Sequence, residues 1–190
     1  MEYAVLGDAD GGPKLRLDHR EFSYAGKFVM SNTGKAVARE GGDSGGDDEE
    51  DGDEEDGIVA AVAFNEDRTD PATAWLRYVT VRDERRGEGV GARLARFAAA
   101  ELRDRGYDRV KIAVNNPFAY HALYKAGFAY TGEQTGLAEL VLVRPGERDT
   151  DRYRSGLDAY RERDDLAPEE RSFLAAKADA EPPDVLDVPE

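Results

Sequence analysis

A glycine-rich segment between a strand pattern and a helix pattern constrains the fold of this chain most. Residues 75–81 are aromatic and β-branched, which predicts a strand. Apolar residues then recur at helical spacing from Leu94 to Leu102, before Gly106. Residues 109–114 alternate as a second strand. A strand, a helix and a strand in this order predict a mixed sheet with helices packed on it.

Further patterns extend this unit in both directions. The other predicted strands are residues 2–6, 35–40, 58–65 and 137–144, and a short helix is predicted for residues 118–126. Residues 35–40 and 58–65 are expected to be the two arms of a hairpin. Residues 15–30 are either a helix or an irregular covering segment. The fold class is therefore α/β (α+β).

The character of the chain changes after Pro145. Tyr153, Leu157 and Tyr160 form an apolar helical stripe, and Pro168 opens a second helix. We expect a domain over residues 1–145, a helical appendage over 146–179 and a disordered tail over 180–190. The appendage packs either on the domain or on a second copy of the chain, as in a homodimer.

Acidic residues dominate the charge, and they are unevenly placed. The chain has 41 acids and 26 bases, a formal net charge of -15, which argues against nucleic acid as a partner. Residues 41–57 hold ten acids and no base, so this low-complexity insertion in the hairpin cannot form a core. Only six of the bases are lysines. Such a composition fits a halophilic protein, since concentrated salt screens self-repulsion.

Several other classes of site are excluded by composition. The absence of cysteine rules out disulfides, a thiolate zinc site and a cysteine nucleophile. His19 and His121 lie far apart, so we expect no metal. The apolar run from Ile58 to Phe64 is too short to span a membrane, which needs about 20 residues. Glu2 stands where a signal peptide would carry bases, and a cytoplasmic protein is expected.

Gly87, Gly89 and Gly91 alternate where the strand gives way to the helix. A turn of this kind exposes successive backbone N–H groups, and the helix N-terminus adds about half a positive charge. Phosphate is the natural ligand of such a turn. Five arginines crowd the same stretch and are expected to attract a polyanion: Arg82, Arg85, Arg86, Arg93 and Arg96.

Two motifs in order give the chain a family resemblance. The first is Arg86-Gly-Glu-Gly-Val-Gly91, and the second runs from Asn116-Pro-Phe-Ala to Gly127-Phe128. With them, residues 35–144 resemble the GNAT superfamily, the Gcn5-related acetyltransferases. The resemblance implies a mixed, mostly antiparallel central sheet with flanking helices. It also implies acetyl-CoA as cosubstrate and direct transfer of its acetyl group to an amine on a small molecule or a protein.

The resemblance further implies which residues hold acetyl-CoA. Backbone N–H groups of the glycine loop would bind the pyrophosphate, and main-chain atoms of the preceding strand would bind the pantetheine arm like an added strand. Asn116 would sit beside the cofactor. The implied binding residues are Val79, Val81, Arg86, Gly87, Glu88, Gly89, Val90, Gly91, Ala92 and Asn116.

The expected general acid is the point at which the chain departs from the family. The family places a tyrosine seven residues after the asparagine, and here that count lands on Leu123. Tyr124 lies one residue further, which rotates its side chain by about 100° around a helix. Tyr124 is thus either the general acid or a packing residue. No general base is assigned, because the strand at residues 75–81 carries no glutamate, which leaves a chain of water molecules as an alternative. Asp18 and Glu21 lie in the region that shapes the acceptor pocket in the family, but a solvated surface role is expected for both.

Two other functions compete with an acetyltransferase. A non-catalytic acetyl-CoA sensor or interaction module would keep the loop and lose the tyrosine. A serine hydrolase is suggested by Gly42-Asp-Ser44-Gly, but such a serine needs a fixed turn, a nearby histidine and a buried acid, whereas Ser44 begins the acidic tract.

Overall fold

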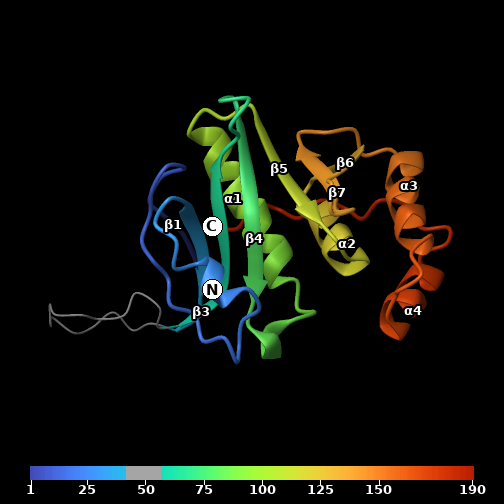
Figure 1. Cartoon of the computed structure of the whole chain (residues 1–190), viewed down its shortest axis with the longest axis horizontal. Helices are drawn as coiled ribbons and strands as arrows, with labels where there is room; N and C mark the ends of the chain where they lie inside the picture. Colours follow the sequence, from blue (N-terminus) through green and yellow to red (C-terminus); the bar gives the residue numbers. More distant parts are fainter. Residues whose placement is uncertain (42–56) are drawn as a thin grey trace, which may run out of the picture.

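The structure is a computed structural model that describes residues 1–41 and 57–190. Its centre is a sheet with the strand order β1-β2-β3-β4-β5-β7-β6 (Figure 1). The strands are β1 (Glu2–Leu6), β2 (Gly34–Arg39), β3 (Ile58–Glu66), β4 (Thr73–Val81), β5 (Arg109–Val114), β6 (Ala129–Gln134) and β7 (Leu140–Arg144). The helices are α1 (Val90–Asp104), α2 (Pro117–Lys125), α3 (Thr150–Arg161) and α4 (Pro168–Ala176). The mixed, mostly antiparallel sheet is confirmed.

The parallel pair sits where the sequence predicts it, and it is short. β4 and β5 run parallel, whereas every other pair of described strands is antiparallel. Their register ends at Leu76 opposite Ile112, although β4 continues to Val81 against β3. The two strands therefore separate after Leu76. The last part of β4 keeps one edge free of a strand partner in the described structure.

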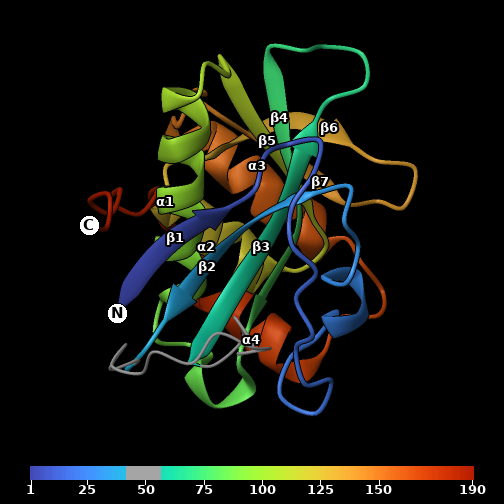
Figure 2. The same ribbon diagram turned by 90° about the vertical axis from the view of Figure 1, so that its left-hand side faces the viewer.

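Both faces of the β1–β4 part of the sheet are covered. α1 packs on one face through apolar residues such as Leu94 and Leu102, as the helical spacing predicts. Residues 15–28 pack on the other face, where Leu15 and Phe28 are fully buried (Figure 2). β3 is buried on both faces, and its side chains form a continuous apolar run. The sheet is thus the middle layer of the domain.

Residues 15–30 adopt the irregular alternative rather than a helix. One short 3-10 helix, η1 (Ala25–Lys27), interrupts them, and the Leu15 N–H donates to the Phe28 carbonyl at 2.9 Å. The strand predicted from residue 137 begins only at Leu140. Thr135 forms a turn there by accepting hydrogen bonds from the N–H groups of Leu137 and Glu139. Side-chain bonds of this kind compete with strand pairing.

The two C-terminal helices pack beside α2 and β6. The stripe of Tyr153, Leu157 and Tyr160 on α3 is fully buried, as expected, and it joins the main core. α4 contacts both α2 and α3. The division into a domain at 1–145 and an appendage at 146–179 stays a prediction, but the appendage packs on its own chain here.

Residues 180–190 form no helix or strand, yet several are tied to the domain. The Leu186 N–H donates to the Lys125 carbonyl at 2.8 Å, and Arg148 donates to the Pro183 carbonyl at 2.7 Å. Most of the acidic insertion at 41–57, and Ser44 with it, lies outside the described residues. Within the described ranges no helix is long and apolar enough to cross a membrane.

Candidate active site

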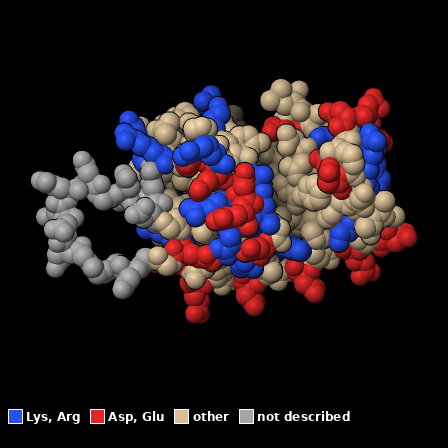
Figure 3. All heavy atoms as spheres, turned by 90° about the horizontal axis from the view of Figure 1, so that it is seen from below, with Lys and Arg blue, Asp and Glu red and all other residues tan. Residues whose placement is uncertain are grey.

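A cleft of about 750 Å³ opens where β4 and β5 separate. Its walls come from the end of β4, the loop before α1, the first turn of α1, one face of α2 and two residues of α4. Figure 3 shows the molecule from below, with a groove between a part crowded with charged atoms and a wall that is mostly uncharged. The cleft thus joins the two sequence motifs to the C-terminal appendage.

The glycine loop forms one wall of this cleft. Gly87 and Gly89 have φ angles of 85° and 76°, in the left-handed region that glycine tolerates best. Gly89 is the N-cap of α1, so the first N–H groups of the helix follow it without intrahelical acceptors. A Cβ on Gly91 would lie 3.0 Å from Val81, and glycine here lets α1 approach β4 closely. The loop presents bare main chain to the cleft, as predicted.

The two arginines directly before Gly87 are paired with carboxylates. Arg85 forms ion pairs with Glu40 and Glu88, and the hydrogen bond from Arg85 lowers the pKa of Glu40. Arg86 lies 2.7 Å from Asp83 and donates to the Ser23 hydroxyl at 2.7 Å. These pairs neutralise much of the charge that was expected to attract a polyanion. Attraction of an anion therefore depends chiefly on backbone N–H groups and the helix dipole.

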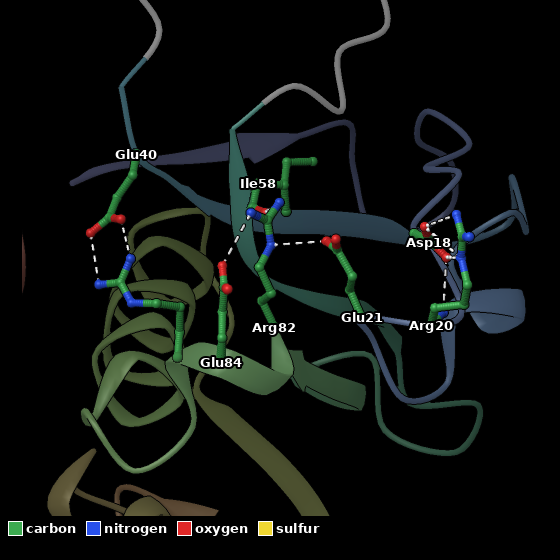
Figure 4. A network of polar contacts seen from close by, with 8 residues as sticks. Asp18, Arg20, Glu21, Glu40, Ile58, Arg82 and Glu84 are labelled. Carbon is green, nitrogen blue, oxygen red and sulfur yellow. Dashed lines mark hydrogen bonds and ion pairs between the residues drawn. The ribbon is translucent and has the colours of Figure 1, made fainter.

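Arg82, which directly follows β4, is also paired with carboxylates. Its guanidinium lies 3.3 Å from Glu21 and 3.8 Å from Glu84, and it donates to the Ile58 carbonyl at 2.9 Å (Figure 4). Asp18 pairs with Arg20, whose hydrogen bonds lower the pKa of Asp18 to about 2. Neither Asp18 nor Glu21 lines the cleft. Both acids have the surface role that the sequence favours.

The strand edge and Asn116 also lie where the sequence places them. Val79 and Val81 line the cleft, on the part of β4 that has separated from β5. Asn116 is the N-cap of α2, and its side-chain oxygen accepts a hydrogen bond from the Ala119 N–H at 2.8 Å. The cap fixes the start of α2 at the cleft, since an unmet N–H there would be costly. The structure therefore brings Val79, Val81 and Asn116 together with the glycine loop.

Tyr124 is not brought to the cleft. Its side chain is fully buried, and its hydroxyl accepts a hydrogen bond from the Tyr130 N–H at 3.0 Å. Its ring packs against Tyr153, with centroids 4.7 Å apart, and burial raises the pKa of Tyr124. Leu123 lines the cleft instead. Because Tyr124 is one position further along α2 than Leu123, its side chain points into the core. Of the two roles considered for Tyr124, the structure therefore favours packing.

His121 is a cleft residue that sequence reasoning assigned to an ordinary polar position. It lines the cleft, and its Nδ1 lies 2.8 Å from the Tyr153 hydroxyl. Burial, with smaller effects from Lys177 and Lys125, lowers the pKa of His121 to about 4. The imidazole is therefore neutral at pH 7. The spacing of Phe118, His121 and Lys125 along one helix face could have identified this stripe.

Comparisons with known proteins agree with this geometry. The model of the acetyltransferase (GNAT) family matches residues 28–128. That segment runs from before β2 to the end of α2, and it includes the glycine loop and Asn116. It leaves α3 and α4 outside. No curated protein sequence matches the chain.

Three solved structures illustrate the likeness. Nourseothricin acetyltransferase is 19% identical, with a TM-score of 0.46, over 75% of this chain and 96% of that chain. An IAA acetyltransferase from Bacillus cereus is 17% identical, with a TM-score of 0.48, over 75% of this chain and 98% of that chain. PaiA N-acetyltransferase from Thermoplasma acidophilum, in complex with coenzyme A, is 16% identical, with a TM-score of 0.42, over 57% of this chain and 58% of that chain.

Proposed function

Because this chain belongs to the acetyltransferase (GNAT) family, we propose that it transfers the acetyl group of acetyl-CoA directly to an amine. The observation that carries the proposal is that one cleft contains both a loop with exposed backbone N–H groups and a strand edge that has no partner among the described strands. Gly87 and Gly89 open the loop at the N-terminus of α1, and Val79 lies on the β4 edge that β5 has left. Such a junction suits a ligand that carries both phosphates and amides.

The residues present fit the cosubstrate. A Cβ on Gly87 would meet nothing within 4 Å, so the backbone there is open to a ligand. The N–H groups of residues 87–92 would hold the pyrophosphate, as helix N-termini hold anions elsewhere. Main-chain groups of Val79 and Val81 would hold the pantetheine amides in the manner of an added strand. When bound, acetyl-CoA supplies an activated acetyl group as a thioester.

The described residues of the cleft align the reactants, and no tyrosine among them acts as a general acid. Leu123 lines the cleft where the family resemblance places a tyrosine, and Tyr124 is buried behind it. The carboxylate that lines the described cleft belongs to Glu170, which accepts a hydrogen bond from the Ala167 N–H at 2.9 Å. Because thiols have pKa values of about 8.5, the sulfur of CoA can leave as a thiolate without a general acid, and the proton that the attacking amine loses passes to water. We therefore assign catalysis chiefly to alignment of a neutral amine with the thioester.

A panel of amines tests the reaction. Small polyamines, aminoglycosides, amino acids and peptides with free N-termini or lysines would each be incubated with acetyl-CoA, and free CoA would be measured with a thiol reagent. We expect CoA release that depends on one class of amine. Release that is equal with and without every amine would contradict acetyl transfer.

A second function, a non-catalytic module that binds acetyl-CoA, is favoured by one observation. Tyr124 is buried, so α2 presents Leu123 rather than a tyrosine to the cleft. Such a module would bind acetyl-CoA in calorimetry and release no CoA with any amine. Binding together with release would leave the enzyme as the remaining candidate.

A further inference from the structure

Three aromatic side chains meet at the end of the cleft between α2 and α4. The rings of Phe118 and Phe173 have centroids 4.9 Å apart, and those of His121 and Phe173 are 5.6 Å apart. All three side chains line the cleft. Phe118 keeps 45% of its surface exposed, which is unusual for a phenylalanine that already has a ring partner. We call these three side chains the aromatic ledge.

The aromatic ledge combines an uncharged stacking surface with charged groups at its rim. His121 is neutral at pH 7, because burial lowers its pKa to about 4. Glu170 lines the same end and places a carboxylate there. Two lysines lie at this end: Lys125 lines the cleft, and the Lys177 Nζ lies 5.7 Å from the centroid of the Phe173 ring. A flat, uncharged heteroaromatic ring can stack on these aromatic side chains.

The path of the cleft leads a nucleotide to this end. With pyrophosphate at residues 87–92 and pantetheine along β4, the remaining part of the cosubstrate must leave the loop in another direction. Toward Ser23 the way is bridged by Arg86, which donates to the Ser23 hydroxyl at 2.7 Å and pairs with Asp83. Toward α2 the cleft stays open and is lined by Asn116 and Phe118.

We propose that the aromatic ledge is the surface on which the adenine base of coenzyme A stacks, so that helix α4 forms part of the cosubstrate site. This inference rests on the proposed function. Phe173 lies outside the segment that the family model matches, and its role follows from the packing of the appendage alone. The α3–α4 appendage then contributes to binding, because it holds Phe118 in place and supplies a second ring.

Two carriers test the proposal, because 4′-phosphopantetheine lacks the entire 3′-phosphorylated AMP portion of coenzyme A, adenine included. Coenzyme A and 4′-phosphopantetheine would each be titrated calorimetrically into wild-type protein and into the variants Phe118→Ala and Phe173→Ala. Because stacking of one base contributes about 1–3 kcal/mol, we expect either variant to weaken binding of coenzyme A by about 5- to 150-fold. Affinity for 4′-phosphopantetheine should stay within twofold of wild type.

Matched variants separate the loss of a ring at the aromatic ledge from a general loss of stability. Phe97→Ala removes a ring that packs on Tyr3 away from the cleft, and Tyr24→Ala removes an exposed cleft-lining ring that packs on Tyr78 and not on the aromatic ledge. Both should keep the wild-type ratio of the two affinities. Phe173→Leu keeps apolar volume, so it separates the loss of a ring from a loss of folding.

The outcomes are distinct. The measured quantity is the ratio of the affinity for coenzyme A to the affinity for 4′-phosphopantetheine. If this ratio is unchanged in Phe118→Ala and Phe173→Leu, or falls only in Tyr24→Ala, the aromatic ledge is not the adenine site. Wild-type protein that binds neither carrier would instead refute the proposed function on which the inference rests.

Discussion

At the scale of single residues, the direction in which α2 presents its side chains decides what the cleft can do. The count from Asn116 to Leu123 left two alternatives for Tyr124, the general acid or a packing residue, and the buried side chain fits the second. The sequence could not show what Tyr124 does instead. Its partner, the Tyr130 N–H, belongs to a strand whose position is fixed only in the folded chain.

Tyr124→Phe should therefore affect stability rather than turnover. Loss of the hydroxyl leaves the buried Tyr130 N–H without its acceptor, and we expect a loss of about 1–3 kcal/mol in the free energy of unfolding. Turnover with the best amine should change less than threefold between pH 7 and 9.5. Urea denaturation and rate measurements on the same preparation check both points. A selective fall in turnover at high pH would place the hydroxyl in the reaction.

His121→Gln should change how stability depends on pH. The folded pKa of His121, about 4, lies below the 6.5 expected for the unfolded chain, so the unfolded state binds more protons between these values. His121 therefore lowers stability as pH falls from 6.5 to 4, and the variant should fall less steeply. His19→Gln is the control, since the His19 side chain is 87% exposed. Equal slopes for wild type and His121→Gln would show that the imidazole is not buried.

At the scale of elements, local patterns predict most strands and helices, but they miss β6 and fail where a side chain ends an element. β1 and β5 have the predicted bounds, because alternation and β-branched residues dominate them. The start of β7 was wrong by three residues because Thr135 bonds to the backbone. Contacts between α3 and α2 could not be predicted, since nothing local specifies that Gly156 faces Tyr120.

Gly156→Ala tests how closely α3 is seated. An added Cβ would lie 2.1 Å from the Tyr120 hydroxyl oxygen, whose ring is fully buried. Alanine in a helix gains about 0.5–1 kcal/mol over glycine, whereas overpacking costs about 1–3 kcal/mol, so we expect a net loss of stability. Gly26→Ala, with nothing within 4 Å of the new atom, should not destabilise the protein. A more stable Gly156→Ala would contradict the close packing.

At the scale of the whole molecule, charge is arranged in ways that composition alone conceals. The loop arginines looked like an anion trap in the sequence, but Glu40, 45 residues away from Arg85, neutralises one of them. Such long-range pairing becomes visible only when the sheet brings β2 beside the loop. The site therefore depends on main-chain groups, which the glycines did predict.

The excess of acid gives an expectation for salt. A net charge of -15 makes the folded chain repel itself, and molar salt shortens the Debye length to about 3 Å. We expect the melting temperature to rise between 0.05 and 2 M KCl, despite weaker surface ion pairs. Calorimetric scans in KCl and in an equal concentration of a neutral osmolyte separate charge screening from other effects. An unchanged or falling melting temperature in KCl would refute adaptation to salt.

The central claim is that bare main chain at residues 87–92 holds the pyrophosphate of acetyl-CoA. Calorimetric titration of acetyl-CoA into wild type, Gly89→Val and Gly106→Val tests it most directly. Both glycines have positive φ angles, at opposite ends of α1, and only Gly89 lines the cleft. We expect both variants to lose similar stability, and Gly89→Val alone to lose at least tenfold in affinity. Equal affinities for the two variants, or no heat with wild type, would contradict the account.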